Sequence, residues 1–134
     1  MALTYSIDES ASLIRVRWDG DPKDQTSADS LKQLLTDPAL RPGLNYLSDQ
    51  RGLESPGTTP LVTGAVHFLQ RLAQTQGPFK CAVVVAREAS FGMGRMAEAF
   101  TSGTDVEVKA FYSIEDAESW LAEPRKPDQE AGPK

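Results

Sequence analysis

The sequence contains very little of the two residue types that most often build metal sites. Cys81 is the only cysteine among 134 residues, so an intrachain disulfide and a thiolate cluster are both excluded. It lies in the valine-rich run 81–86, where a free cysteine is usually a small buried apolar residue. His67 is the only histidine, and we expect it to be structural or exposed, because a triad or zinc site needs matching partners. No cofactor or metal is predicted.

Long apolar runs and excess positive charge are also lacking. No stretch approaches the roughly 20 apolar residues that span a bilayer, so we expect no stable membrane insertion. The first residues have neither the basic start nor the apolar centre of a signal peptide, which favours a cytoplasmic protein. The net charge of −5 repels phosphate backbones and disfavours nucleic acid as a partner.

What is present is the pattern of one α/β domain over residues 1–122. Apolar and polar residues alternate in 3–7 and 14–18, which predicts an antiparallel hairpin. Helical and extended patterns then alternate, which predicts a mixed sheet of about five strands with flanking helices. The further expected elements are a helix capped by Ser27, a strand over 44–48, a helix from Thr59-Pro60 to Gln76, a buried strand over 81–86, a helix capped by Ser90, a strand over 106–110 and a helix capped by Ser113.

The last segment, residues 123–134, differs from the rest in composition. It contains three prolines and no large apolar residue, so it has nothing to bury. Such a composition is typical of a disordered tail.

A candidate binding site lies where two predicted strands lead into helices. The segment 49–58 is longer than such a connection needs, and long loops are more often functional. Right-handed crossovers should bring this segment and the start of the helix at residue 90 to the same end of the sheet. We therefore expect a site with positive charge, hydroxyl groups and one apolar wall, made from Asp49, Arg51, Ser55, Thr58, Thr59, Ser90, Phe91 and Arg95.

The element Gly92-Met93-Gly94-Arg95 allows two interpretations. It lacks the third glycine of a dinucleotide fingerprint and the Lys-Ser/Thr pair of a P-loop. Its place near a helix start would let free N–H groups and Arg95 hold an anion. Alternatively, the small residues let the helix lie close to the sheet, and we favour this second interpretation.

The order of elements, together with the segments 42–49, 91–98 and 106–111, resembles the SpoIIAA-like proteins, bacterial members of the wider STAS-like fold. The resemblance covers about residues 3–121 and implies a mixed sheet and a non-enzymatic role. STAS domains that antagonise anti-sigma factors bind a kinase and are phosphorylated on a Ser or Thr just after a strand that ends in Asp. Asp49 matches that Asp, but Gln50-Arg51-Gly52 follows it, and Ser55, Thr58 and Thr59 come later.

Three classes of function stay open at this point. The first is a regulatory module that binds a protein partner or a small apolar or anionic ligand. The second is a carrier of an apolar, lipid-like molecule, which has been suggested for SpoIIAA-like members. The third is a small enzyme that uses Asp49 as an acid and Arg95 as an anion clamp. We also expect a homodimer, because Leu53, Phe68 and Phe91 add apolar residues on loops or outer helix faces.

Overall fold

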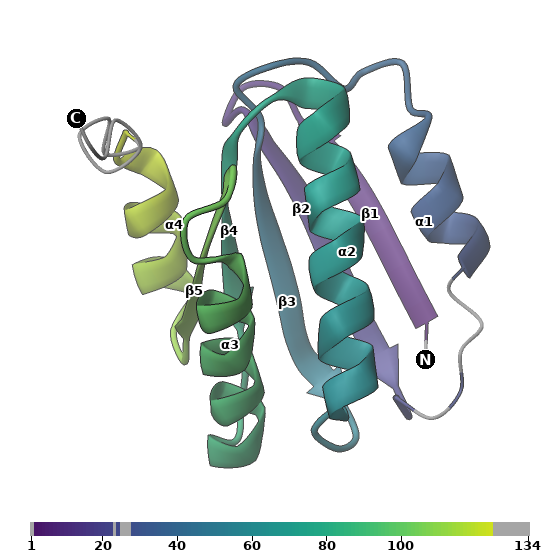
Figure 1. The fold of residues 1–134 in the computed structure, drawn as a ribbon, viewed down its shortest axis with the longest axis vertical. Coiled ribbons are helices and arrows are strands. Elements are labelled where there is room, and N and C mark those ends of the chain that lie inside the picture. The colour runs from purple at the N-terminus through teal and green to yellow at the C-terminus, as the bar shows by residue number, and fades with distance from the viewer. Residues whose placement is uncertain (1, 23, 25–27, 125–134) are drawn as a thin grey trace.

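The computed structural model describes residues 2–22, 24 and 28–124 as one five-stranded sheet with helices on both faces (Figure 1). The predicted cap at Ser27 and the predicted tail from residue 125 onward lie outside the described residues. The elements are β1 (Ala2–Asp8), β2 (Leu13–Gly20), α1 (Ala28–Leu35), β3 (Asn45–Leu53), α2 (Thr59–Gln76), β4 (Phe79–Val84), α3 (Glu88–Thr101), β5 (Val106–Phe111) and α4 (Ile114–Ala122).

The strands lie side by side in the same order as in the chain. β1 and β2 form the predicted antiparallel hairpin, with Tyr5 opposite Val16. β2, β3, β4 and β5 are all parallel, so each is joined to the next by a crossover helix. The predicted mixed α/β sheet is thus confirmed.

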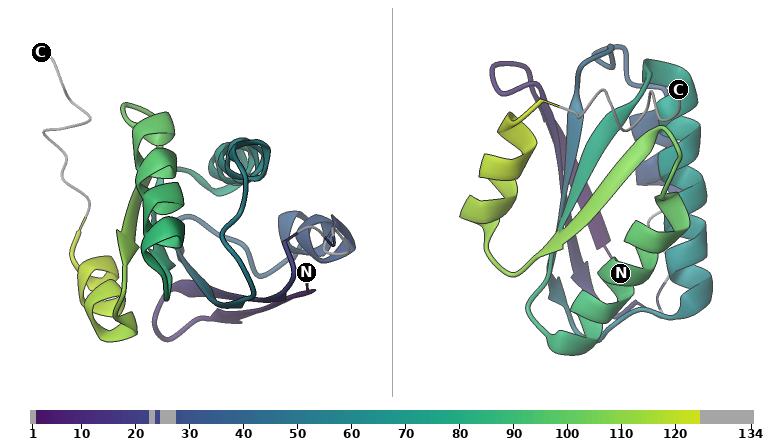
Figure 2. Two further views of the ribbon diagram at one scale, coloured as in Figure 1. Left: turned by 90° about the horizontal axis from the view of Figure 1, so that it is seen from below. Right: turned by 60° about the vertical axis from the view of Figure 1, so that its left-hand side comes forward.

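Two apolar layers hold the helices on the sheet. The helices α1, α2 and α3 cover one face, and α4 covers part of the other (Figures 1 and 2). The larger layer joins sheet residues such as Ile14, Val16 and Tyr46 to Leu34 of α1 and Leu72 of α2. The smaller layer packs α4 on the opposite face through Leu13, Leu47, Ala82, Val84, Ala117 and Leu121.

Cys81 to Val85 are buried, as predicted, but Ala86 is exposed, and the strand begins earlier than predicted, at Phe79. β4 pairs with β3 on one side and β5 on the other, and all six of its residues are buried. A strand covered by helices on both faces has no solvated face, which explains why its sequence does not alternate.

The sequence predicts that the strand ends at residue 48 and that residues 49–58 form a loop, and this prediction is wrong. β3 continues through Asp49 and Arg51 to Leu53. The connection to α2 is therefore Glu54–Thr58, an ordinary length for a strand–helix loop. The prediction failed because Asp49, Arg51 and Gly52 look like loop residues when their neighbours in space are unknown.

Two helix starts also differ from the prediction. Thr58, not Thr59, caps α2: its side chain accepts a hydrogen bond from the Leu61 N–H. α3 begins at Glu88, one turn before the expected start, and its cap residue Arg87 makes no side-chain cap bond. Ser90 therefore lies inside α3 and is not its cap.

The outer faces of α2 and α3 hold two exposed side chains of interest. Phe100 on α3 is 47% exposed. His67 is exposed on α2, as expected.

Among the described residues, none of the helices is both long enough and apolar enough to cross a membrane.

α4 is fixed at both ends by hydrogen bonds. Ser113 caps its start and accepts from the Asp116 N–H, as the sequence predicts. At its end, the buried Lys80 ammonium donates to the carbonyls of Trp120 and Glu123, and it lies 4.2 Å from the centre of the Trp120 ring. A cation at a helix C-terminus satisfies carbonyls that have no helical partner. Glu123 therefore belongs with α4, although the sequence placed it in the tail.

Candidate functional site

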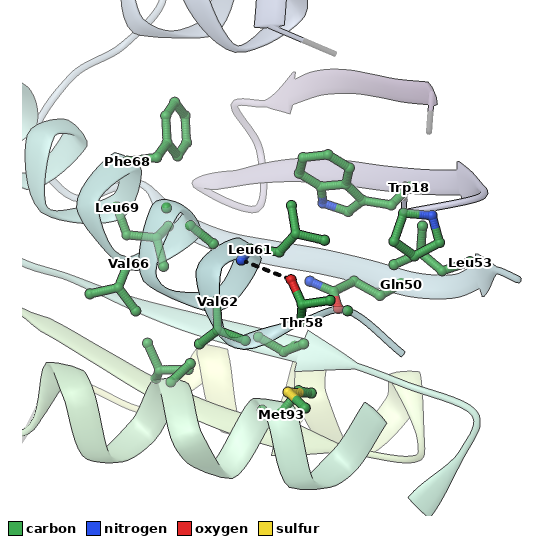
Figure 3. A pocket seen from close by; sticks show the side chains of 18 of the residues that line it. Trp18, Gln50, Leu53, Thr58, Leu61, Val62, Val66, Phe68, Leu69 and Met93 are labelled. Atoms are coloured by element: carbon green, nitrogen blue, oxygen red, sulfur yellow. Dashed lines mark hydrogen bonds between the residues drawn. The ribbon is translucent and has the colours of Figure 1, made fainter. Parts of the chain in front are cut away.

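A pocket of about 600 Å³ lies between α2 and the sheet, open toward the loop that joins β3 to α2 (Figure 3). The described wall comes mainly from that loop and from seven elements, β2, α1, β3, α2, β4, α3 and β5, and most of its side chains are apolar. None of the described residues that line it is charged. The main apolar residues of the wall are Trp18, Leu53, Leu61, Val62, Phe68 and Met93.

The pocket exists because the apolar face of α2 is only partly packed. Val66 and Leu69 are buried, whereas Leu61 and Val62, one to two turns nearer the helix start, remain half-exposed. The neighbouring helix α3 contributes Met93, Gly94 and Ala97 to the pocket wall, and two of these residues, Gly94 and Ala97, are small. Short side chains opposite a wide gap leave space that a ligand can fill.

A β-bulge shapes the sheet side of the pocket. Arg17 lies opposite Asp49, but Asp19 lies opposite Gly52, so β3 has one more residue than β2 between these pairs. A bulge of this kind bends the strand and redirects its side chains. A Cβ at Gly52 would lie 2.8 Å from the backbone oxygen of Trp18, so the bulge requires glycine here. Trp18 on β2 borders this bulge and lines the pocket.

One hydrogen-bonded group lies at the base of this wall. The Trp18 Nε1–H donates to Ser48 Oγ over 3.0 Å, and Gln50 Nε2 lies 3.2 Å from the same oxygen. Ser48 is only 4% exposed, whereas Gln50 is half-buried and lines the pocket. The hydrogen bond to Ser48 thereby fixes the indole N–H of Trp18 against the sheet.

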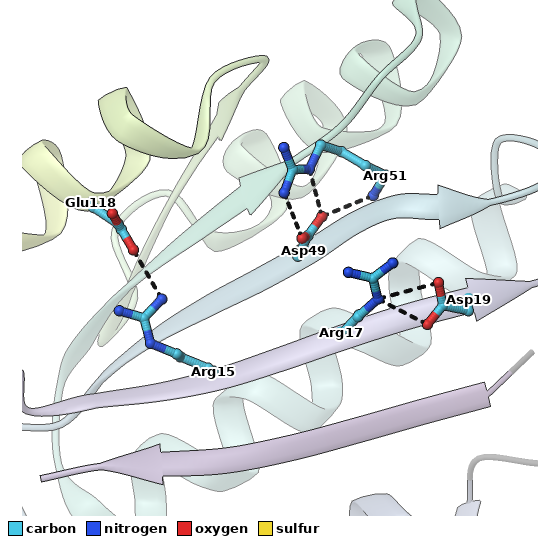
Figure 4. Close-up of polar contacts among 6 residues, drawn as sticks. All are labelled: Arg15, Arg17, Asp19, Asp49, Arg51 and Glu118. Atoms are coloured by element: carbon cyan, nitrogen blue, oxygen red, sulfur yellow. Dashed lines mark hydrogen bonds and ion pairs between the residues drawn. The ribbon is translucent and has the colours of Figure 1, made fainter.

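Asp49 and Arg51 point to the other face of the sheet, because successive strand residues alternate. Arg51 donates to both Asp49 oxygens, at 2.9 and 2.8 Å (Figure 4). These hydrogen bonds lower the pKa of Asp49, and the positive charge of Arg17 lowers it further. The same face carries the ion pairs Arg17–Asp19 at 3.1 Å and Arg15–Glu118 at 2.9 Å. Each of these arginines is thus paired with a carboxylate.

The remaining predicted site residues do not converge either. Thr58 lines the pocket, but Ser55 and Thr59 are not part of its described wall. Arg95 is exposed on α3 and pairs with Glu98 at 3.2 Å. Phe91 stacks on the Tyr112 ring, with centroids 4.7 Å apart. The eight residues are therefore spread over both faces of the sheet, and a shared binding role for them stays a prediction.

The sequence does not predict the pocket, although it indicates which face of α2 is apolar. Leu61, Val62, Ala65, Val66 and Leu69 have the helical spacing of an inner face. That spacing indicates which side of α2 faces the sheet. It does not indicate whether the space opposite is filled, because this depends on side chains from α3 and from the bulge.

Two buried side chains of the described region, Cys81 and Tyr46, carry groups that burial keeps protonated. Burial raises the pKa of the Cys81 thiol far above its ordinary value, so the thiol stays protonated. Burial likewise raises the pKa of the Tyr46 hydroxyl. Within residues 2–22, 24 and 28–124, no three His, Cys, Asp or Glu side chains come together as a metal site would require.

Comparison with known proteins supports the fold and gives no activity. No family model matches the chain, and no curated protein matches it. A similar solved structure is the crystal structure of an uncharacterized protein of the DUF3478 family, with a SpoIIAA-like fold, from Shewanella loihica PV-4. The two chains are 20% identical, the TM-score is 0.59, and the match covers 90% of this chain and 94% of the other. The chain therefore has a SpoIIAA-like fold, as its sequence suggests.

Proposed function

We propose that this chain is a non-enzymatic binding protein that holds an apolar small molecule in the pocket between α2 and the sheet. The observation that carries the proposal is the pocket itself. Its volume of about 600 Å³ is within the range of about 300–1,000 Å³ that is usual for small-molecule sites. Its wall is mainly aliphatic and aromatic, with few polar groups, which is also usual for such sites.

The geometry favours this function over the enzyme that the sequence left open. Asp49 is engaged by Arg51 on the face of the sheet away from the pocket, and Arg95 is an exposed residue of α3. An acid and an anion clamp must reach one substrate together. Binding of a protein partner remains a prediction that rests on the resemblance to STAS domains.

Filling the pocket tests the proposal. We expect Val62→Trp to weaken binding of the neutral dye Nile red by at least about tenfold, because the indole occupies the ligand's space. His67→Trp is the matched control, since His67 is exposed on the same helix and is not part of the pocket wall. Equal dye binding by both variants and the unmodified protein would show that the pocket is not the site.

A second readout uses the protein's own fluorescence. Trp18 lines the pocket, whereas Trp120 packs on Phe111 under α4. With Trp120→Phe, Trp18 becomes the only tryptophan, and ligand entry should shift its emission. Organic extraction of protein purified from its native host, followed by mass spectrometry, should release a small apolar molecule that the Val62→Trp variant does not carry.

A further inference from the structure

We infer that the ligand of this pocket is uncharged and presents a hydrogen-bond acceptor, such as a carbonyl oxygen, to Gln50 and Thr58. This inference rests on the proposed function and narrows the class of ligand. The first argument is charge. The described wall offers no ionised side chain, and a charge moved from water into an apolar wall without a counter-ion is strongly disfavoured. A ligand held within the pocket is therefore neutral.

The second argument is the hydrogen-bond count at Ser48. The indole N–H of Trp18 can only donate, so Ser48 Oγ accepts there. When the Gln50 side chain is oriented with Nε2 toward Ser48, Ser48 Oγ accepts two hydrogen bonds, one from Trp18 and one from Gln50. The O–H group of Ser48 then has no acceptor among the described residues. Turning the Gln50 amide by 180° keeps the same contact and lets the Ser48 O–H donate to Oε1. This orientation satisfies the buried serine and leaves the Gln50 NH₂ group free to donate.

The third argument is that the neighbouring hydroxyl group also has a proton to donate. Thr58 Oγ1 accepts the capping hydrogen bond from the Leu61 N–H, which leaves its O–H available. Figure 3 shows Thr58 and Gln50 reaching into the pocket at the end where β3 leads into α2. Both groups are then donors, and one ligand oxygen with two lone pairs can accept from either or both. The apolar body of the ligand extends from there along Leu61, Val62 and Phe68.

Three ligands of equal chain length separate charge from hydrogen bonding. Decane has no polar group, 2-decanone has a neutral acceptor, and decanoate has a charged one. Each is used to displace Nile red from the full chain at pH 8. We expect 2-decanone to bind roughly three- to tenfold more tightly than decane, as one additional hydrogen bond implies, and decanoate to bind most weakly.

Two substitutions assign the preference to Gln50. Gln50→Leu keeps the bulk and removes the amide, and Gln50→Glu keeps an acceptor for the Ser48 O–H but cannot donate at pH 8. Both should reduce the preference for the ketone over decane, with the Thr58 O–H left as the remaining donor, while decane still binds. Gln74→Leu, at an exposed residue of α2 outside the described wall, should leave the preference unchanged.

The possible outcomes separate this inference from the function on which it rests. If decane, ketone and dye bind but the ketone has no advantage, or if its advantage is undiminished in Gln50→Leu and Gln50→Glu, the inferred hydrogen bond to Gln50 is wrong. If decanoate binds most tightly, the inferred neutrality is wrong. If neither the dye nor any of the three molecules binds to the unmodified protein, the proposed function itself fails.

Discussion

Because α3 packs closely on β5, we expect alanine substitutions at two glycines of α3 to change the stability of the protein in opposite directions. Gly94 is buried, and a Cβ there would lie 2.7 Å from the Ala110 Cβ, closer than real Cβ atoms approach. Ala110 belongs to a strand that pairs with β4, so it cannot yield easily. A Cβ at Gly92, two residues earlier, would meet nothing within 4 Å.

Replacing each glycine by alanine therefore separates helix propensity from packing. Alanine is favoured over glycine inside a helix by about 1 kcal/mol. Gly92→Ala should thus stabilise the protein by about 0.5–1 kcal/mol. Gly94→Ala gains the same propensity, but overpacking of a tight contact costs about 1–3 kcal/mol, so we expect a net loss of up to about 2 kcal/mol.

Urea unfolding monitored by circular dichroism measures both effects, and a double mutant identifies their origin. Gly94→Ala combined with Ala110→Gly restores the space between helix and strand. The double mutant should therefore be more stable than the sum of the single effects by about 1 kcal/mol. If Gly92→Ala and Gly94→Ala change the free energy of unfolding equally, the close approach of α3 to the sheet does not explain the glycine.

Three further predictions concern groups outside the pocket. The Cys81 thiol, whose pKa is raised by burial, should resist a thiol reagent at pH 8 in the folded protein and react once urea unfolds it. Arg51 lowers the pKa of Asp49, so this pair stabilises the fold above the ordinary aspartate pKa of about 3.9 and loses that contribution as the pH falls through the folded value. Asp49→Asn should therefore cost at most about 1 kcal/mol at pH 7 and progressively less as the pH falls through the folded pKa, without changing Nile red binding; a large loss of dye binding would contradict the assignment of Asp49 to the opposite face. Lys80→Met should cost about 1–3 kcal/mol in urea unfolding, because it leaves carbonyls at the end of α4, including that of Trp120, without their donor.

The sequence predicted the fold well because its buried strands and helix faces carry strong apolar patterns. The run at Cys81 identifies β4, and the alternation around Val16 identifies β2. Ser113 was assigned correctly as the cap of α4, because its hydrogen bond is made within one turn. Patterns of this kind depend on contacts within a few residues or on burial alone.

The candidate site was harder to predict because it depends on which face of the sheet each residue joins. Asp49 and Arg51 were expected beside Thr58, but they belong to a strand that continues to Leu53, and they alternate away from the pocket. The residues that pair with them across the sheet are distant in the sequence, so no local pattern shows that Asp49 and Arg51 belong to a strand. The bulge opposite Trp18 also depends on an approach of two strands that a single sequence does not reveal.

The agreement between strand order and chain order has a consequence for how the protein folds. Every pair of neighbouring strands is also consecutive in the sequence, from β1–β2 to β4–β5. Each strand therefore joins an edge that already exists, and no strand has to be inserted between two others. The sheet is thus suited to growth from the N-terminus during synthesis, one strand and one helix at a time. The Arg15–Glu118 ion pair joins residues 103 positions apart and forms only after α4 docks, so it reports completion of the last step.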